Sequence, residues 1–137
     1  MNVRDVMTPE PIVLSHQATV QEAAQRMRDA DVGDVLVERD GKLCGIITDR
    51  DIVVRVIANQ QSADSTTLED CCSEDLHTLS PDEDADVAVQ TMRQHAIRRI
   101  PVVENGKALG IVSMGDLAMR RDEKSALGEI SSKPANN

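Results

Sequence analysis

Apolar positions along the chain fall into short runs, and the spacing within the runs changes in a regular order. A first apolar run at residues 12–14 predicts a short strand. The next run places apolar residues at every third or fourth position, which predicts a helix that begins after Thr19. Glu22 stands three residues after Thr19, the spacing of a capping box. The members of this helical stripe are Val20, Ala23, Ala24 and Met27.

Two further apolar runs, 35–37 and 43–47, flank the dipeptide Asp40-Gly41. Asp-Gly between apolar runs is a strong signal for a β-hairpin. A last helix is expected to start near Asp51. It carries more apolar residues than one core-facing stripe needs, which predicts that a second chain covers the excess face. Its apolar residues are Ile52, Val53, Val54, Val56 and Ile57.

The second half of the chain repeats this order. A weaker strand is expected around residues 76–79, a helix capped by Asp84, and a hairpin around Asn105-Gly106. A final helix should start near Asp116. The stripe of the second helix consists of Ala85, Ala88, Val89 and Met92.

The two halves match at a constant offset of 65 residues, without a gap. The matched pairs include Gly41 with Gly106, Lys42 with Lys107, Gly45 with Gly110, Ile46 with Ile111, and Met27 with Met92. Many matches at one offset, in the same order, indicate a duplication. The pattern predicts an α+β fold of two βαββα repeats, at 1–60 and 61–122, followed by a flexible tail at 123–137. Because each unit is too small to bury a core alone, the repeats should pack with pseudo-two-fold symmetry and leave two related clefts.

Composition narrows the possible functions. The chain has no aromatic residue and a formal net charge of −9. Single-stranded nucleic-acid binders stack bases on aromatic rings, and a negative field repels phosphate backbones, so nucleic acid is not an expected partner. No apolar run has the length of a membrane span, and the N-terminus does not read as a signal peptide, which predicts a cytoplasmic protein without a membrane partner.

The cysteines and histidines do not form a recognisable site. Three cysteines with two adjacent, Cys71 and Cys72, make no disulfide framework. A zinc site from this pair and His77 has poor spacing. Cys44 is expected to pack as a small hydrophobe in a strand. His16, His77 and His95 lack the spacing of metal ligands, and no catalytic constellation is present, so neither a catalytic residue nor a metal is predicted.

Two matching segments stand where a strand gives way to a helix: Gly-Ile-Ile-Thr-Asp-Arg-Asp (45–51) and Gly-Ile-Val-Ser-Met-Gly-Asp (110–116). A helix N-terminus attracts phosphate, a hydroxyl adds a donor, and an Asp three residues later can accept hydrogen bonds from a ribose diol. The same Thr-x-x-Asp and Ser-x-x-Asp spacings are also plain capping boxes. The two roles are compatible. Gly45 and Gly110 are expected where the backbone approaches the other repeat or a ligand closely.

Arg98 and Arg99 enter the strand that begins the second hairpin. Adjacent strand residues point to opposite faces, so at the mouth of a strand the two could reach a phosphate from both sides. The alternative is a solvated pair that balances an acidic surface.

These motifs, taken in order with Val-Met-Thr-Pro near the start and Ile-Arg-Arg-Ile-Pro-Val-Val at 97–103, resemble a tandem pair of CBS domains. The chain is similar to small stand-alone bacterial CBS-pair proteins, including the hypoxic-response type, over residues 3 to about 120. The resemblance implies a non-catalytic regulatory module, a Bateman module, that binds AMP, ADP, ATP, S-adenosylmethionine or another adenosine derivative in its clefts. It also implies a homodimer and an effector protein that the sequence does not name. No cofactor is required.

In the family the sites are crossed between the repeats. The resemblance implies a preferred cleft formed by Thr48, Asp51, His77, Thr78, Arg98 and Arg99. It implies a second cleft formed by Ile12, Val13, Gly33, Asp34, Ser113 and Asp116. The second cleft has Asp34 where the first has Arg99, and a carboxylate there would oppose a phosphate. An interaction protein of the same fold with empty clefts is the alternative function.

Overall fold

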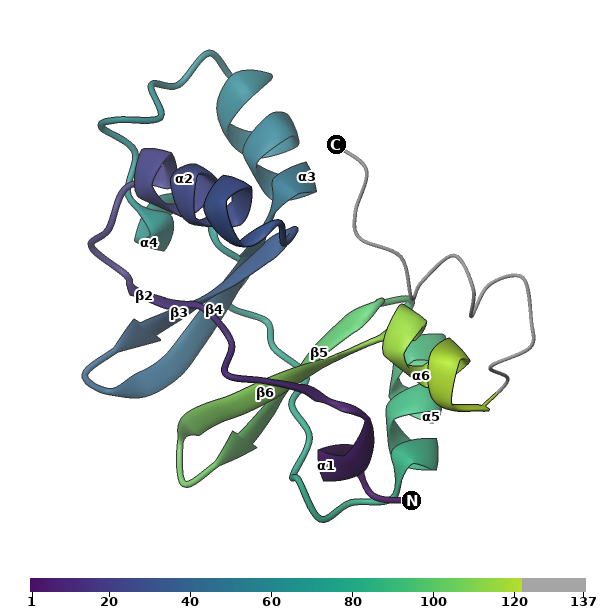
Figure 1. Ribbon diagram of the computed structural model, residues 1–137. Coiled ribbons are helices and arrows are strands. Elements are labelled where there is room, and N and C mark those ends of the chain that lie inside the picture. The colour runs from purple at the N-terminus through teal and green to yellow at the C-terminus, as the bar shows by residue number, and fades with distance from the viewer. Residues whose placement is uncertain (122–137) are drawn as a thin grey trace. The chain divides into compact units, whose positions relative to one another are not determined.

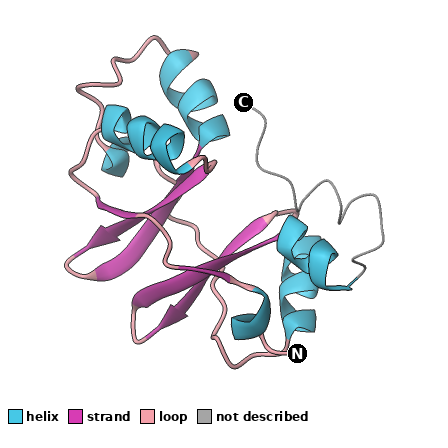
Figure 2. Cartoon of the chain, in the orientation of Figure 1, coloured by secondary structure: helices cyan, strands magenta, loops and turns pink. Residues whose placement is uncertain are grey.

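A computed structural model of the chain describes residues 1–121, which divide into two compact units (Figure 1). Ile12–Leu76 form one unit, and Met1–Pro11 form the other with the chain from His77 onward. Each unit combines helices with a three-stranded sheet, which confirms the mixed α+β class (Figure 2). The tail predicted at 123–137 lies outside the described residues.

The unit of residues 12–76 contains a sheet in the order β2-β3-β4, with β2 parallel and β4 antiparallel to β3. Thr19 caps the first helix by accepting a hydrogen bond from the Glu22 N–H, which is one half of the predicted capping box. The helix after the hairpin continues as a π-helix, η1. The elements are β2 (Val13–Ser15), α2 (Val20–Ala30), β3 (Asp34–Arg39), β4 (Lys42–Thr48), α3 (Asp49–Asp51), η1 (Ile52–Ile57) and α4 (Leu68–Cys71).

The unit of residues 1–11 and 77 onward contains a sheet in the order β1-β6-β5, antiparallel throughout. Asp84 caps its longer helix, as predicted, by accepting a hydrogen bond from the Asp86 N–H. The elements are α1 (Val3–Val6), β1 (Thr8–Pro9), α5 (Ala85–His95), β5 (Arg99–Glu104), β6 (Lys107–Ser113) and α6 (Met114–Arg121).

Each unit has its own aliphatic core. In both, the buried residues of the predicted helical stripe pack against the inner residues of the hairpin. Ala24 and Val89, the remaining members of the two stripes, are only half-buried. The buried stripe residues are Val20, Ala23 and Met27 in α2 and Ala85, Ala88 and Met92 in α5.

Both predicted hairpins are confirmed, and their turns explain the sequence. Asp40 and Gly41 adopt φ of 53° and 77°, and Asn105 and Gly106 adopt φ of 55° and 81°. Two successive positive φ values define the type I′ turn that matches the twist of paired strands, and these residue types tolerate it best.

Two expectations need correction. The helices after the hairpins begin at Asp49 and Met114, two residues before Asp51 and Asp116, because Thr48 and Ser113 cap them and the aspartates lie in the first turn. The strand expected at 76–79 is reduced to one bridge, between Leu79 and Val102.

The sequence repeats and the compact units divide the chain differently. β1 belongs to the first half of the sequence but pairs with β6 of the second half. Ser73, which follows the connection between the repeats, pairs with Ile46 in β4. Each hairpin therefore gains an edge partner from the N-terminal part of the other repeat. Within residues 1–121, no helix combines the length and the apolar character needed to cross a membrane.

Candidate nucleotide-binding residues

The Thr48–Asp51 turn joins β4 to α3 in a reciprocal capping box. The Asp51 N–H donates to the Thr48 Oγ1 at 3.1 Å, and the Thr48 N–H donates to the Asp51 Oδ2 at 2.8 Å. The Asp51 side chain is 17% exposed, and its second oxygen, Oδ1, lies 3.8 Å from the Nε of Arg55. The capping interpretation of this motif is confirmed. It engages one carboxylate oxygen fully and leaves the other with a single, long charged contact.

The Ser113–Asp116 turn has the same geometry in the other unit. The Asp116 N–H donates to the Ser113 Oγ at 3.0 Å, and the Ser113 N–H donates to the Asp116 Oδ2 at 3.0 Å. Thr8 of β1 adds a contact that sequence reasoning missed, because its Oγ1 lies 3.4 Å from both carboxylate oxygens of Asp116. Thr8 belongs to the Val-Met-Thr-Pro motif, which was visible in the sequence. The sequence did not indicate that this motif lies beside Asp116.

The other four residues that were predicted for the preferred cleft lie around β5. Arg99 opens the strand, half-buried and opposite Ser113, while Arg98 is exposed and its carbonyl accepts a hydrogen bond from the Met114 N–H at 2.9 Å. The ring of His77 stacks on that of His95, with centroids 3.7 Å apart and planes at 22°. Thr78 is exposed beside them.

The remaining residues that were predicted for the second cleft lie at one end of the β2-β3-β4 sheet. The carbonyl of Ile12 accepts the Leu36 N–H at 2.9 Å, and Val13 opens β2. Asp34 opens β3 directly opposite Thr48. The carbonyl of Gly33 accepts the Asp49 N–H at 3.0 Å.

Both predicted residue sets are divided between the two units. Thr48 and Asp51 lie in the unit of residues 12–76, whereas their four predicted partners lie in the other unit. The second set is divided in the opposite sense, with Ser113 and Asp116 in the unit that contains β6. The structure describes each half in detail, and the assembly of either complete site stays a prediction.

Gly45 and Gly110 lie at close backbone approaches, as predicted. A Cβ atom on Gly45 would lie 2.5 Å from the Cys72 Sγ, and one on Gly110 would lie 2.6 Å from the Thr8 carbonyl oxygen. Both neighbours come from the N-terminal part of the other repeat. The glycines therefore make room for the edge segments that complete each sheet.

The cysteines are free thiols in poorly solvated positions. Burial raises the pKa of the Cys72 thiol to about 11, and the neighbouring Cys44 and Glu74 add to the rise. Burial also raises the pKa of Cys44 and Cys71. Since the thiolate is the nucleophile, a raised pKa makes these thiols weak nucleophiles at neutral pH. Among residues 1–121, no three His, Cys, Asp or Glu side chains gather as a metal site would require.

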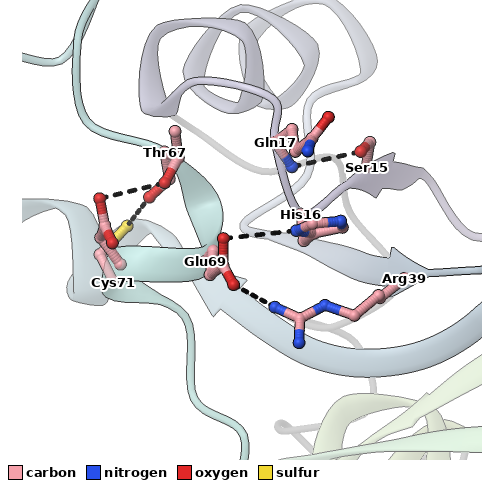
Figure 3. Close-up of polar contacts among 8 residues, drawn as sticks. Ser15, His16, Gln17, Arg39, Thr67, Glu69 and Cys71 are labelled. Carbon is pink, nitrogen blue, oxygen red and sulfur yellow. Dashed lines mark hydrogen bonds and ion pairs between the residues drawn. The ribbon is translucent and has the colours of Figure 1, made fainter.

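A polar cluster that the sequence did not predict holds α4 against the sheet (Figure 3). Glu69 of α4 binds Arg39 at the end of β3, and its other oxygen lies 3.5 Å from the Nδ1 of His16. The Glu69 N–H also donates to the His16 carbonyl at 3.0 Å. The cluster fixes the first turn of α4.

Comparison with known proteins assigns the family. The CBS domain model matches residues 3–58 and 68–123. The CBS domain-containing protein YhcV of Bacillus subtilis is 36% identical over 127 residues, which cover 93% of this chain and 90% of that protein.

Solved structures agree. Hypoxic Response Protein I, crystallised with two coordinated zinc ions, has a TM-score of 0.77 and 27% identity, covering 88% of this chain and 98% of its own. The CBS domain pair of protein MJ0100, solved with 5′-methylthioadenosine and S-adenosyl-L-methionine, has a TM-score of 0.79 and 26% identity, covering 91% of this chain and 98% of its own. The duplicated strand–helix unit, the paired capping turns and these likenesses converge, and the chain belongs to the CBS-domain family, as a tandem pair of CBS domains.

Proposed function

We propose that the chain is a regulatory module that binds an adenosine derivative through the Thr48–Asp51 turn. The observation that carries the proposal is the carboxylate of Asp51, which the Thr48 N–H holds through Oδ2 while Oδ1 lies 3.8 Å from the Arg55 Nε, beyond hydrogen-bond distance. A ribose diol offers two O–H donors at the spacing of one carboxylate. The adenosine compounds bound to the MJ0100 domain pair support this ligand class.

The other residues of the proposed site would serve the rest of the nucleotide. Arg98 and Arg99 would meet the phosphate, since guanidinium forks suit phosphate oxygens. His77 and Thr78 would line the entrance to the proposed nucleotide site. The adenine would pack between aliphatic side chains, because the chain has no Phe, Trp or Tyr. AMP, ADP, ATP and S-adenosylmethionine all fit this description.

Calorimetry with AMP and adenosine tests the proposal. Asp51→Ala should weaken both ligands, because the carboxylate acts on the ribose. Arg99→Ala should weaken AMP about ten- to a hundredfold and spare adenosine, because a charge-assisted contact to phosphate contributes roughly 1.5–3 kcal/mol. Asp116→Ala is the matched control and should leave AMP binding unchanged. Loss of AMP binding in Asp116→Ala with full binding in Asp51→Ala would contradict the assignment.

A protein-interaction role with empty clefts is the second candidate, and the surface of η1 favours it. Val53, Val54 and Ile57 are 55%, 46% and 64% exposed, a large apolar surface on one short helix. A second copy of the chain is the proposed occupant, in a symmetric homodimer formed largely by helices. Light scattering should give a dimer mass for the wild type and a monomer mass for Val54→Asp. Absence of binding to any adenosine compound, together with a stable dimer, would favour this role.

A further inference from the structure

Arg55 makes two contacts that connect separate parts of the unit of residues 12–76. Its Nε lies 3.8 Å from the Asp51 Oδ1, one turn earlier. Its Nη1 donates to the carbonyl of Cys71 at 3.2 Å. Cys71 is the last residue of α4 and is 4% exposed, so its carbonyl depends on this donor. One guanidinium therefore joins a carboxylate of the capping turn to the C-terminal end of α4.

The end of α4 controls the edge pairing that follows it. The Cys72 N–H donates to the Leu68 carbonyl at 2.9 Å and closes the helix. The next residue, Ser73, pairs with Ile46 in both directions, at 3.0 and 3.1 Å. A change in the contact to Cys71 therefore reaches β4 within two residues.

We propose that Arg55 is a positioning residue that links the state of the Asp51 carboxylate to the last turn of α4 and to the pairing of Ser73 with β4. Ribose hydroxyls that donate to Asp51 Oδ1 weaken its ion pair with Arg55. The guanidinium is then held more by its hydrogen bond to the Cys71 carbonyl, which tightens the end of α4. The ligand part of this inference rests on the proposed function, whereas the linkage itself is a property of the free protein.

Hydrogen exchange of the Cys72 and Ser73 amides in the free protein tests the linkage. Arg55→Met should speed their exchange about two- to tenfold, the effect of one hydrogen bond of modest strength. Asp51→Asn should change the exchange rates of the same two amides in the wild-type background. The change should be smaller in the Arg55→Met background. The amide of Val37 in β3 reports any global loss of stability. Arg26→Met, which removes an exposed arginine from α2, is the matched control and should change none of these rates.

Arg55→Lys separates positioning from packing. Lysine keeps the charge near Asp51, so part of the coupling between the two positions should return, whereas a purely structural role for the side chain predicts no such recovery. Equal effects of Asp51→Asn in both backgrounds, or unchanged exchange in Arg55→Met, would overturn the proposal.

Addition of adenosine provides a second test. In the wild type, adenosine should slow the hydrogen exchange of the Cys72 amide. In Arg55→Met, it should bind without slowing that exchange. If calorimetry detects no adenosine binding to the wild type, the proposed function fails while the free-protein cycle still decides the linkage. If adenosine binds and slows the amide equally in both proteins, the linkage fails and the proposed function stands.

Discussion

The two compact units differ in the strand that runs parallel to the first strand of each hairpin. In the unit of residues 12–76, β2 pairs with β3 over three residues, and the Leu36 N–H donates to the Ile12 carbonyl. In the other unit the position equivalent to Leu36 is Pro101, which has no N–H, and the parallel partner is reduced to one bridge, between Leu79 and Val102. Proline removes one bond from the ladder, so the partner strand ends where that bond is missing. The residue at this one position, leucine or proline, therefore explains why the parallel edge strand is longer in one unit than in the other.

The helices after the hairpins differ as well. α6 is α-helical through Arg121, whereas η1 closes i→i−5 bonds, including the one from the Ala58 N–H to the Val53 carbonyl. Five of the six residues in Ile52–Ile57 are β-branched, and such side chains crowd the α-helical turn. The equivalent residues of α6 include Leu117 and Met119, which are good helix formers.

The charge beside each capping turn is reversed between the units. Asp34 stands opposite Thr48, and Arg99 stands opposite Ser113. The proposed preference of a nucleotide for the Thr48–Asp51 turn therefore requires the arginines of the other repeat to outweigh Asp34. The Asp51→Ala and Asp116→Ala comparison measures that balance directly.

The largest expected losses of stability come from substituting Gly45 and Gly110, and the two losses should differ in size. Gly110→Ala should lower the free energy of unfolding by about 2–3 kcal/mol, because its Cβ would meet the backbone carbonyl of Thr8, which cannot move without disrupting β1. Gly45→Ala should cost less, about 1–2 kcal/mol, because its nearest neighbour is the side-chain sulfur of Cys72. Urea denaturation of both variants gives the two values.

Cys72→Ala provides the control for this pair. It should relieve part of the cost of Gly45→Ala and none of the cost of Gly110→Ala, which a double-mutant cycle measures. Equal rescue of both glycine variants would show that the clash with Cys72 is not the cause.

Local signals predicted most of the elements, and the exceptions have identifiable causes. The hairpins follow from Asp40-Gly41 and Asn105-Gly106, and the helix starts from Thr19 and Asp84, because these residues act within a few positions of themselves. The pairing of β1 with β6 joins distant parts of the chain. The spacing of apolar residues carries no information about such pairing. The shortened strand at Leu79 also depends on a proline in its partner rather than in its own sequence.

The same limit applies to the candidate site. The residues of each capping turn were predicted because the motif is local. The roles of Thr8 beside Asp116 and of Arg55 beside Cys71 depend on which segments pack together. The sequence alone supplies their identities but not their partners.

A smaller effect on stability should appear at alkaline pH. It comes from the Cys72 thiol, which is buried beside Gly45. The pKa of Cys72 rises from its ordinary value of 9.0 to about 11 in the folded state. The unfolded chain therefore releases this proton at lower pH than the folded protein, so stability falls as pH rises from 9.0 to about 11. Below this window the contribution is fully present. We expect a loss on the order of 1 kcal/mol across it, measured by urea denaturation. The slope should flatten in Cys72→Ala, and an unchanged slope would assign the effect to other groups.

The smallest effect concerns the residues that end α2 and α5. Asp31 and Ala96 stand at equivalent positions, and both adopt the left-handed conformation, with φ of 55° and 53°. Alanine has no polar group to compensate for the steric cost of this conformation, whereas aspartate can form local hydrogen bonds there. Ala96→Gly should therefore raise the free energy of unfolding by about 0.5–1 kcal/mol, and Asp31→Gly should raise it by less. Ala24→Gly, within α2, is the control and should lower stability, because the same substitution in a helix interior has the opposite sign. Urea denaturation resolves all three, and a gain for Asp31→Gly that exceeds the gain for Ala96→Gly would show that the aspartate does not relieve the strain.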